Sequence, residues 1–296
     1  MVTVLVLLGI GVLAARLPSL PARTPEALDW LVLWLALPGL IIARVPDLDL
    51  EPSAVVPVAV AWGTLVLLAL LILLLARILD WPRRTVGTLL LVVPLGNTSF
   101  LGIPAVEALL GPGHVPYALV YDQLGSFLAL ATWGTFVAAR YGAGAMPTLA
   151  GTLRRIVTFP PFVALVVALI LRTVDAPAVV DDVAATLGAM LVPLTMVAVG
   201  MRLDIPREAT TFGPLVSGLV LRLGLAPLAV FGAALLLDGS GAAWETSLLE
   251  SSMPPMVTAG IVASAAGLDD KLSAALVGLG VIAAMVTAPF WAGVLS

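Results

Sequence analysis

Two polar, proline-containing stretches interrupt apolar segments that are otherwise long enough to cross a bilayer. The first is PLGNTSFLGIP (residues 94–104) and the second is ESSMPPMVTAG (residues 250–260). Proline and glycine break a helix and leave backbone N–H and C=O groups unpaired, and hydrocarbon offers these groups no partner. Irregular backbone at membrane depth is tolerated only where protein buries it or where it lines a cavity. We therefore expect both stretches to lie inside the molecule.

The composition is that of a membrane protein. Of the 296 residues, 61% are hydrophobic and only 11% are charged, whereas a soluble domain carries about 25% charge. No sizeable soluble domain fits into such a chain. The absence of cysteine excludes disulfides and thiol catalysis, and a single histidine, His114, argues against a zinc site. We expect no cofactor and no resident metal, and no basic run predicts nucleic-acid binding.

Ten segments are long and apolar enough to be membrane spans of an all-α protein. They are residues 2–16, 27–44, 54–79, 85–111, 115–140, 156–173, 179–202, 210–237, 243–267 and 270–295. Of the 14 Lys and Arg residues, 11 lie at odd-numbered loops, Arg44 and Arg172 lie at even-numbered loops, and Arg222 lies inside a span. Basic residues favour cytoplasmic loops. This distribution predicts a multi-pass protein of the cytoplasmic membrane with both termini outside.

The ten spans divide into two halves that echo each other. An odd number of spans per half means that the second half enters the membrane upside down, so we predict two inverted five-helix repeats, 1–140 and 156–296, joined by a short cytoplasmic linker at 141–155. The interrupted spans are fourth in each half, as spans four and nine, and we expect them to cross at their breaks. Paired interruptions of this kind are typical of the binding site of a secondary transporter. The positive N-terminal ends of the half-helices can hold an anion, and the freed carbonyls can hold a cation.

The two motifs resemble those of a known family. The run from Gly96 to Pro104 is similar to the fourth-helix motif of the auxin efflux carrier family, and Met253-Pro254-Pro255 with Thr258-Ala259-Gly260 is similar to its ninth-helix motif. This family includes bacterial dicarboxylate permeases and plant auxin carriers. The resemblance covers the whole chain in span number and in the positions of the breaks. The short linker fits the prokaryotic members.

The resemblance implies a fold shared with bile acid:sodium symporters and sodium/proton antiporters. It implies a scaffold formed by 1–50 and 156–204 and a transport core formed by 54–140 and 210–296. It also implies elevator-like movement of a small organic carboxylate, and a homodimer through the scaffold helices.

The candidate site residues fall into three groups. Predicted substrate contacts, chosen because amides, hydroxyls and a guanidinium bind carboxylates, are Asn97, Thr98, Ser99, Arg222 and Thr258. Predicted coupling-ion residues, chosen because an acid inside a span is a functional candidate, are Asp122, Gln123, Ser126 and Glu250. Predicted helix-break residues are Gly96, Pro104, Pro254 and Pro255.

Several alternatives stay open at this level. Arg222 can bind substrate or pair with Asp122 or Glu250 as a buried salt bridge. The coupling ion can be Na⁺ or H⁺. A symporter or antiporter of the bile-acid type with a different solute uses the same architecture. The sequence contains no phosphate-binding loop, so nothing in it indicates ATP as the energy source. An intramembrane enzyme is less favoured because His114 and Lys271 lie in loops, and a channel is less favoured because paired broken helices indicate alternating access more than an open pore.

Overall fold

The computed structural model describes residues 2–21, 23–45, 52–142, 150–151, 154, 157–173, 177–201 and 212–294. Most of the linker at 141–155, the end of span seven at 202 and the start of span eight at 210–211 lie outside these residues. The described part is all-helical and contains no β-strand. Five of its helices are long and apolar enough to cross a membrane: Thr24–Arg44, Val55–Ile78, Ala178–Met201, Phe212–Leu236 and Asp270–Ala292.

The elements of the described residues follow one another along the chain in this order. They are α1 (Val2–Ala14), α2 (Thr24–Leu31), η1 (Val32–Ala36), α3 (Leu37–Arg44), η2 (Pro52–Ala54), α4 (Val55–Ile78), α5 (Arg83–Val92), η3 (Thr98–Gly102), α6 (Ile103–Leu109), η4 (Pro112–His114), α7 (Val115–Val120), η5 (Tyr121–Phe127), η6 (Leu130–Gly134), α8 (Thr135–Tyr141), α10 (Pro160–Leu171), α11 (Ala178–Gly188), α12 (Leu191–Met201), α13 (Phe212–Val220), η7 (Leu221–Leu225), α14 (Ala226–Leu236), α15 (Ala242–Ser251), α16 (Val257–Ala265) and α17 (Asp270–Ala292). Of the η segments, η2 and η4 are 3₁₀-helical and the other five are π-helical.

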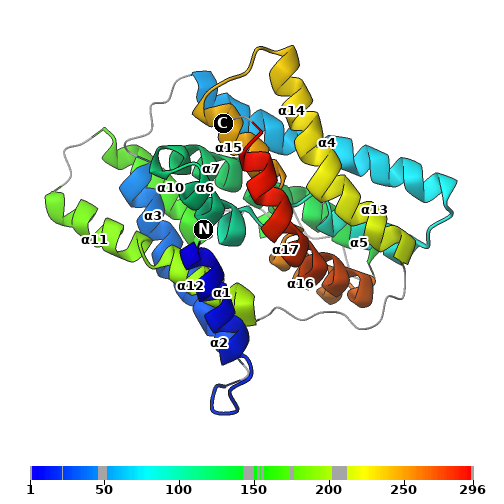
Figure 1. The fold of residues 1–296 in the computed structure, drawn as a ribbon, viewed down its shortest axis with the longest axis horizontal. Helices are drawn as coiled ribbons and strands as arrows, with labels where there is room; N and C mark the ends of the chain where they lie inside the picture. The colour runs from blue at the N-terminus through cyan, green and yellow to red at the C-terminus, as the bar shows by residue number, and fades with distance from the viewer. Residues whose placement is uncertain are drawn as a thin grey trace.

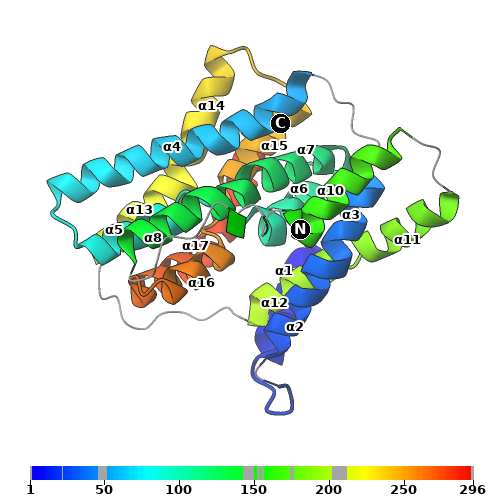
Figure 2. The ribbon, with the colours of Figure 1, turned by 180° about the vertical axis from the view of Figure 1, so that it is seen from behind.

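The helices gather into two groups (Figures 1 and 2). In the first group α1 packs along α12, and α3 packs along α10 and α11. Helices α4, α5, α8, α13, α14, α16 and α17 form the second group, and α6, α7 and α15 lie towards the middle. In lipid, close backbone approach replaces the hydrophobic drive for helix pairing. Glycine provides that approach here: a Cβ on Gly11 of α1 would meet the Gly200 Cα of α12 at 2.9 Å.

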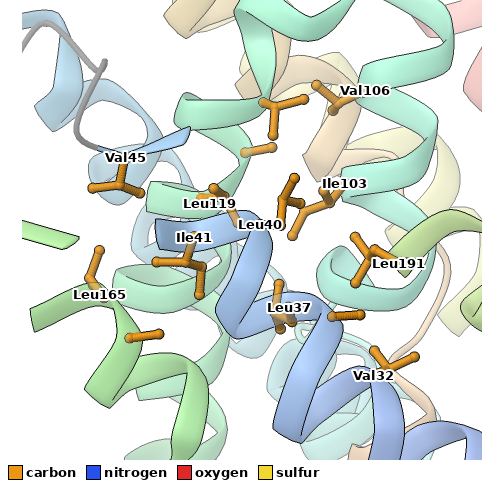
Figure 3. Packing of buried hydrophobic residues seen from close by; sticks show 14 of the residues in the cluster. Val32, Leu37, Leu40, Ile41, Val45, Ile103, Val106, Leu119, Leu165 and Leu191 are labelled. Atoms are coloured by element: carbon orange, nitrogen blue, oxygen red, sulfur yellow. The ribbon is translucent and has the colours of Figure 1, made fainter. Parts of the chain in front are cut away.

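A buried apolar cluster joins the two groups (Figure 3). From the first group it contains η1 and α3 residues such as Leu37 and Ile41, together with Leu191 of α12. From the middle it contains Ile103 of α6 and Leu119 of α7. A second cluster lies within the second group, among α4, α5, α13 and α17.

Hydrogen bonds and an ion pair bring loops together at two places. Arg84, at the start of α5, donates from Nε to the Gly267 carbonyl at 2.9 Å, and Arg83 donates to the Arg140 carbonyl at the end of α8. The third, fifth and ninth loops of the predicted spans thus meet. Elsewhere, His114 of η4 pairs with Glu245 of α15 at 2.7 Å, which joins the fourth and eighth loops.

Candidate functional site

The two stretches that interrupt the apolar segments meet in the interior. Helix α5 ends at Val92, and α15 ends at Ser251. Gly96 and Pro255 form an antiparallel bridge. The Asn97 N–H donates to the Pro254 carbonyl at 2.8 Å, and the Met256 N–H donates to the Leu95 carbonyl at 2.9 Å. Residues 91–98 and 246–256 are all buried, so each stretch satisfies part of the other's backbone without water.

Arg222 of η7 binds the carbonyls that these interruptions free. Its side chain is 1% exposed. It donates from Nε to the Met253 carbonyl at 2.7 Å, from one terminal nitrogen to the Pro94 carbonyl at 3.1 Å and from the other to the Glu250 carbonyl at 3.4 Å. The Pro94 and Met253 carbonyls follow the C-terminal ends of α5 and α15, and the Glu250 carbonyl lies in the last turn of α15, where the helix dipole is negative. No ion pair of Arg222 within 4.0 Å is found among the described residues, so the structure favours neither salt bridge and assigns the guanidinium to main-chain oxygens.

The side of Gly96 that lacks a Cβ is filled by this guanidinium. A Cβ built on Gly96 would overlap a terminal nitrogen of Arg222 and lie 2.9 Å from its Cζ. Glycine is therefore required here by close approach rather than by an unusual backbone angle.

Asp122 of η5 accepts three hydrogen bonds from predicted site residues. Thr98 Oγ1 and Ser99 Oγ each donate to Oδ1 at 2.5 Å, and Gln123 Nε2 donates to Oδ2 at 2.6 Å. The Asp122 side chain is 1% exposed. Charge-assisted hydrogen bonds are strong in a dry interior, so this carboxylate fixes the first turn of η3 against η5.

Other buried polar atoms have no partner. Both carboxylate oxygens of Glu250 lack a hydrogen bond, as do the side-chain amide oxygen and nitrogen of Asn97 and the amide oxygen of Gln123. Glu250 is 0% exposed and Asn97 is 1% exposed. The Glu250 carboxyl lies against Gly102, where an added Cβ would be 2.6 Å from its Cδ. Unpaired buried polar groups cost free energy, and at a native site they indicate a missing ligand, ion or proton.

Two predicted residues lie apart from this network. Thr258, in the first turn of α16, is exposed and lines a cavity of about 50 Å³ with Phe100 and Asp29. Pro104 of α6 lines a cavity of about 60 Å³ with Met253 and Pro254. The two cavities lie between the helix groups, because Asp29 belongs to α2 and the second cavity also touches Met196 of α12.

An apolar cluster adjoins both cavities. It contains Leu8 of α1, Val199 of α12 and Val281 of α17, packed against Phe100 and Leu101 of η3. Phe100 lines one cavity and Leu101 lines the other. The segment η3 therefore presents one side chain to each cavity and joins the Asp122 network through Thr98 and Ser99.

Comparison with known proteins agrees with this architecture. The sequence profile of the family described as "Membrane transport protein" matches residues 1–292. The chain belongs to this family. It is the family that the motifs at Gly96–Pro104 and Met253–Gly260 resemble, and that prediction is confirmed.

Two archaeal relatives cover nearly the whole chain. An uncharacterized transporter of Methanothermobacter thermautotrophicus is 27% identical over 311 aligned positions, which include 99% of this chain and 96% of the relative. An uncharacterized transporter of Methanocaldococcus jannaschii is 25% identical over 304 positions, with the same coverage. Membership of a membrane transport family, together with the long apolar helices, makes the chain a multi-pass membrane transporter rather than an enzyme.

One buried residue of this region, Tyr121, is not among the predicted site residues. Tyr121 is 2% exposed, and its hydroxyl interacts with Thr64 of α4 and with Arg222. It therefore connects the arginine to the helix beside it. Its position directly before Asp122 could have indicated a role in the site, but an aromatic residue inside a span is ordinarily interpreted as a residue of the packed core.

Proposed function

We propose that this protein is a secondary active transporter that moves a small organic carboxylate across the cytoplasmic membrane by alternating access. The observation that carries the proposal is the meeting of two interrupted helices at Gly96 and Pro255, beside the unpartnered polar groups of Asn97, Gln123 and Glu250. Membership of the membrane transport family supports transport. The carboxylate and the mechanism are our inference.

The internal pairing of helices supports an inverted repeat of ten spans. Helix α4 of span three packs on α15 of span nine, and α13 of span eight packs on α5 of span four. Likewise α1 of span one packs on α12 of span seven, and α10 of span six packs on α3 of span two. Within these two pairs, each contact has the counterpart that exchange of the two five-span halves requires. A bundle without internal symmetry has no reason to show this correspondence.

We place the substrate at the N-terminal ends of the second half-helices, η3 and α16. Arg222 occupies the negative ends of α5 and α15, which leaves the positive ends to attract an anion. The amide nitrogen of Asn97 is a buried donor without a partner at the start of η3. Thr258 offers a hydroxyl in the first turn of α16. Thr98 and Ser99 would line the same place, while their hydroxyls stay on Asp122.

We place the coupling ion on the other side of η3, at Asp122, Gln123, Ser126 and Glu250. All four side chains are buried. A buried carboxylate without a hydrogen bond, such as that of Glu250, needs a cation or a proton. The prolines Pro104, Pro254 and Pro255 would keep the half-helices from closing into continuous helices.

The two helix groups correspond to a fixed scaffold and a moving core. Helices α1, α2, α3 and α10 to α12 would form the scaffold (1–50 and 156–204), and the remaining helices would form the core (54–140 and 210–296). The apolar contact around Leu8, Val199 and Val281 lies between the two groups. Elevator-like sliding of the core along this contact would expose the site to each side of the membrane in turn. We further propose a homodimer through scaffold helices, with both termini outside.

Uptake into proteoliposomes tests the function. The purified protein is reconstituted, and accumulation of radiolabelled acetate, malonate and indole-3-acetate is followed under imposed Na⁺ or H⁺ gradients. We expect saturable uptake of at least one carboxylate, and a loss of affinity of about tenfold in Asn97→Ala, because a charge-assisted hydrogen bond contributes about 1.5–3 kcal/mol. Gly113→Ala, in a loop where an added Cβ meets nothing within 4 Å, is the matched control. Unchanged affinity in Asn97→Ala would remove this residue from the site.

A second candidate keeps the ion site and changes the solute. The cavities that flank η3 are lined mainly by apolar side chains, which also fits a bulkier amphipathic solute of the bile-acid type. Competition of taurocholate against the labelled carboxylate separates the two. Transport of taurocholate without transport of any small carboxylate favours this alternative.

A further inference from the structure

Among the described residues, the crossing contains three buried acidic or basic side chains whose formal charges do not sum to zero. In the described part of the chain the charged side chains in the buried class are Asp122, Arg222 and Glu250. Fully ionised, they sum to one negative charge. An uncompensated charge inside a membrane protein is costly, so one more positive charge is needed before the core can be neutral.

Hydrogen bonding distinguishes the three groups. Asp122 accepts from Thr98, Ser99 and Gln123. Arg222 donates to three main-chain carbonyls. Both groups are therefore stabilised in their charged forms. The Glu250 carboxylate has no hydrogen-bond donor at either oxygen, so it is the one of the three whose charge no hydrogen bond stabilises.

The surroundings of Glu250 favour a proton over a metal ion. Its carboxyl is packed directly against Gly102 of η3, and a single proton removes its buried charge without the several oxygen ligands that a hard cation requires. The charged groups nearest to it are Asp122 on η5 and Arg222 on η7. Of the other elements that pack on α15, α6 carries Glu107, α7 carries Tyr117 and η4 carries His114, which pairs with Glu245. Helices α4 and α17 carry charges only near their ends, and α14 and η3 carry no titratable side chain.

We propose that Glu250 carries one proton in each transport cycle, whereas Asp122 stays charged and serves only to position Thr98 and Ser99. This inference rests on the proposed function and assigns separate roles to two acids that share one predicted site. Glu250 is protonated while the core moves and releases the proton once its carboxyl reaches water on the other side. One proton would thus accompany each substrate anion.

The transport assay gives a quantitative expectation. With potassium and valinomycin holding the membrane potential at zero, a pH gradient of about one unit should concentrate malonate, whose dianion does not diffuse through lipid, about tenfold inside wild-type vesicles but not inside protein-free vesicles, since both gradients then carry the same free energy. Glu250→Gln, which mimics the protonated acid, should lose this accumulation and retain exchange of internal for external substrate. Glu250→Asp should recover part of the accumulation. Asp122→Asn should lose accumulation and exchange together, because the turn that holds Thr98 and Ser99 is released.

The control is Glu107→Gln, which changes an acid one helical turn beyond Pro104 and should accumulate substrate as wild type does. Accumulation by Glu250→Gln equal to that of wild type would overturn the proposal. So would wild-type accumulation that follows an imposed Na⁺ gradient and ignores the pH gradient.

A measurement without substrate separates this proposal from the proposed function. Infrared spectroscopy of the purified protein at neutral pH should show the carbonyl band of a protonated carboxyl group. The band should be absent from Glu250→Gln, present in Asp122→Asn and unchanged by added NaCl. If no carboxylate is transported but the band follows Glu250, the proposed substrate is wrong and the proton site stands. A band that persists in Glu250→Gln, or disappears with NaCl, overturns the proton site.

Discussion

At the scale of single residues, the site depends on two glycines that make room for charged side chains. Gly96 accommodates the Arg222 guanidinium, and Gly102 accommodates the Glu250 carboxyl. Both glycines lie on the first interrupted segment (residues 94–104), whereas Arg222 lies on η7 and Glu250 lies on α15. The glycines therefore decide how closely the elements that carry the charges can approach.

Gly102→Ala should damage transport more than a glycine substitution nearby. The new Cβ would be 2.6 Å from Glu250 Cδ and 2.7 Å from Oε1, so the carboxyl or η3 must move, and overpacking of this kind costs about 1–3 kcal/mol. We expect carboxylate uptake to fall at least about tenfold, since 1.4 kcal/mol corresponds to that factor. Gly224→Ala, in η7 with nothing within 4 Å of the added Cβ, is the control. Equal uptake by the two variants would show that the Glu250 carboxyl can shift freely.

The sequence predicted which side chains are candidate site residues but not which groups they contact. Asn97, Asp122 and Glu250 stood out because polar groups inside apolar segments are rare. The partners of Arg222 could not be found in this way. They are main-chain carbonyls from two segments about 30 and 130 positions away, and such contacts depend on tertiary packing and leave no local pattern. The pairing of His114 with Glu245 was missed for the same reason, since His114 reads as a turn residue.

At the scale of elements, Arg222 joins three segments that are not continuous with one another. It lies on η7 and binds carbonyls after α5 and within the end of α15. Removing it would leave these carbonyls buried without donors, at about 1–3 kcal/mol for each orphaned group.

Arg222→Ala should therefore lower the stability of the whole fold. We expect the midpoint of thermal unfolding in detergent, followed by size-exclusion chromatography, to drop by roughly 6 °C or more, since about 1 kcal/mol shifts a protein of this size by a few degrees. The unfolding midpoint of Arg222→Lys should lie between those of wild type and Arg222→Ala, because an ammonium lacks the planar fork that reaches three carbonyls. Arg77→Ala, at the exposed end of α4, is the matched control. A midpoint for Arg222→Ala equal to that of Arg77→Ala would contradict the role assigned to Arg222.

The π-helical segments were not predicted, although the sequence contains a signal for three of them. Segments η1, η3 and η7 end at residues 36, 102 and 225, each two positions before a proline. Proline lacks an N–H and its ring pushes away the carbonyl one turn earlier, and a wider turn relieves both problems. Segment η5, which holds Asp122, has no such proline, so its register follows from packing and not from local sequence.

At the scale of the whole molecule, loops with the same predicted sidedness meet in the structure. Arg83 and Arg84 of the third loop bind backbone of the fifth and ninth loops, and the pair of His114 and Glu245 joins the fourth and eighth loops. These contacts establish which loops share a face, and the side of the membrane that each face meets stays a prediction from the basic residues.

Chemical labelling can decide the sidedness, because the protein has no native cysteine. We expect Gly113→Cys and Ser240→Cys to react with a membrane-impermeant maleimide added to intact cells. Leu79→Cys and Lys271→Cys should react only after the membrane is opened. All four positions are exposed, so protection reports the membrane and not burial. Labelling of Leu79→Cys in intact cells would show that the orientation in the membrane is the reverse of the predicted one.

Movement between the two helix groups can be tested by a covalent cross-link across the apolar contact that lies between them. Val199 of α12 and Val281 of α17 belong to one buried apolar cluster with Leu8, and they lie on the proposed scaffold and core respectively. If the core slides during transport, these two side chains must part. A cross-link between Val199→Cys and Val281→Cys, formed by copper phenanthroline or a short bifunctional maleimide, should abolish uptake, and reduction of the disulfide should restore it.

The control cross-link lies entirely within the proposed core. Val230 of α14 and Leu248 of α15 share another buried cluster, so a bridge between Val230→Cys and Leu248→Cys adds a similar constraint without joining the groups. We expect that doubly substituted protein to transport when oxidised and when reduced, because the core moves as one body. Full uptake by the oxidised Val199→Cys, Val281→Cys protein would mean that the groups do not slide at this contact. Loss of uptake in the control alone would instead place the motion inside the core, between the two halves of the crossing.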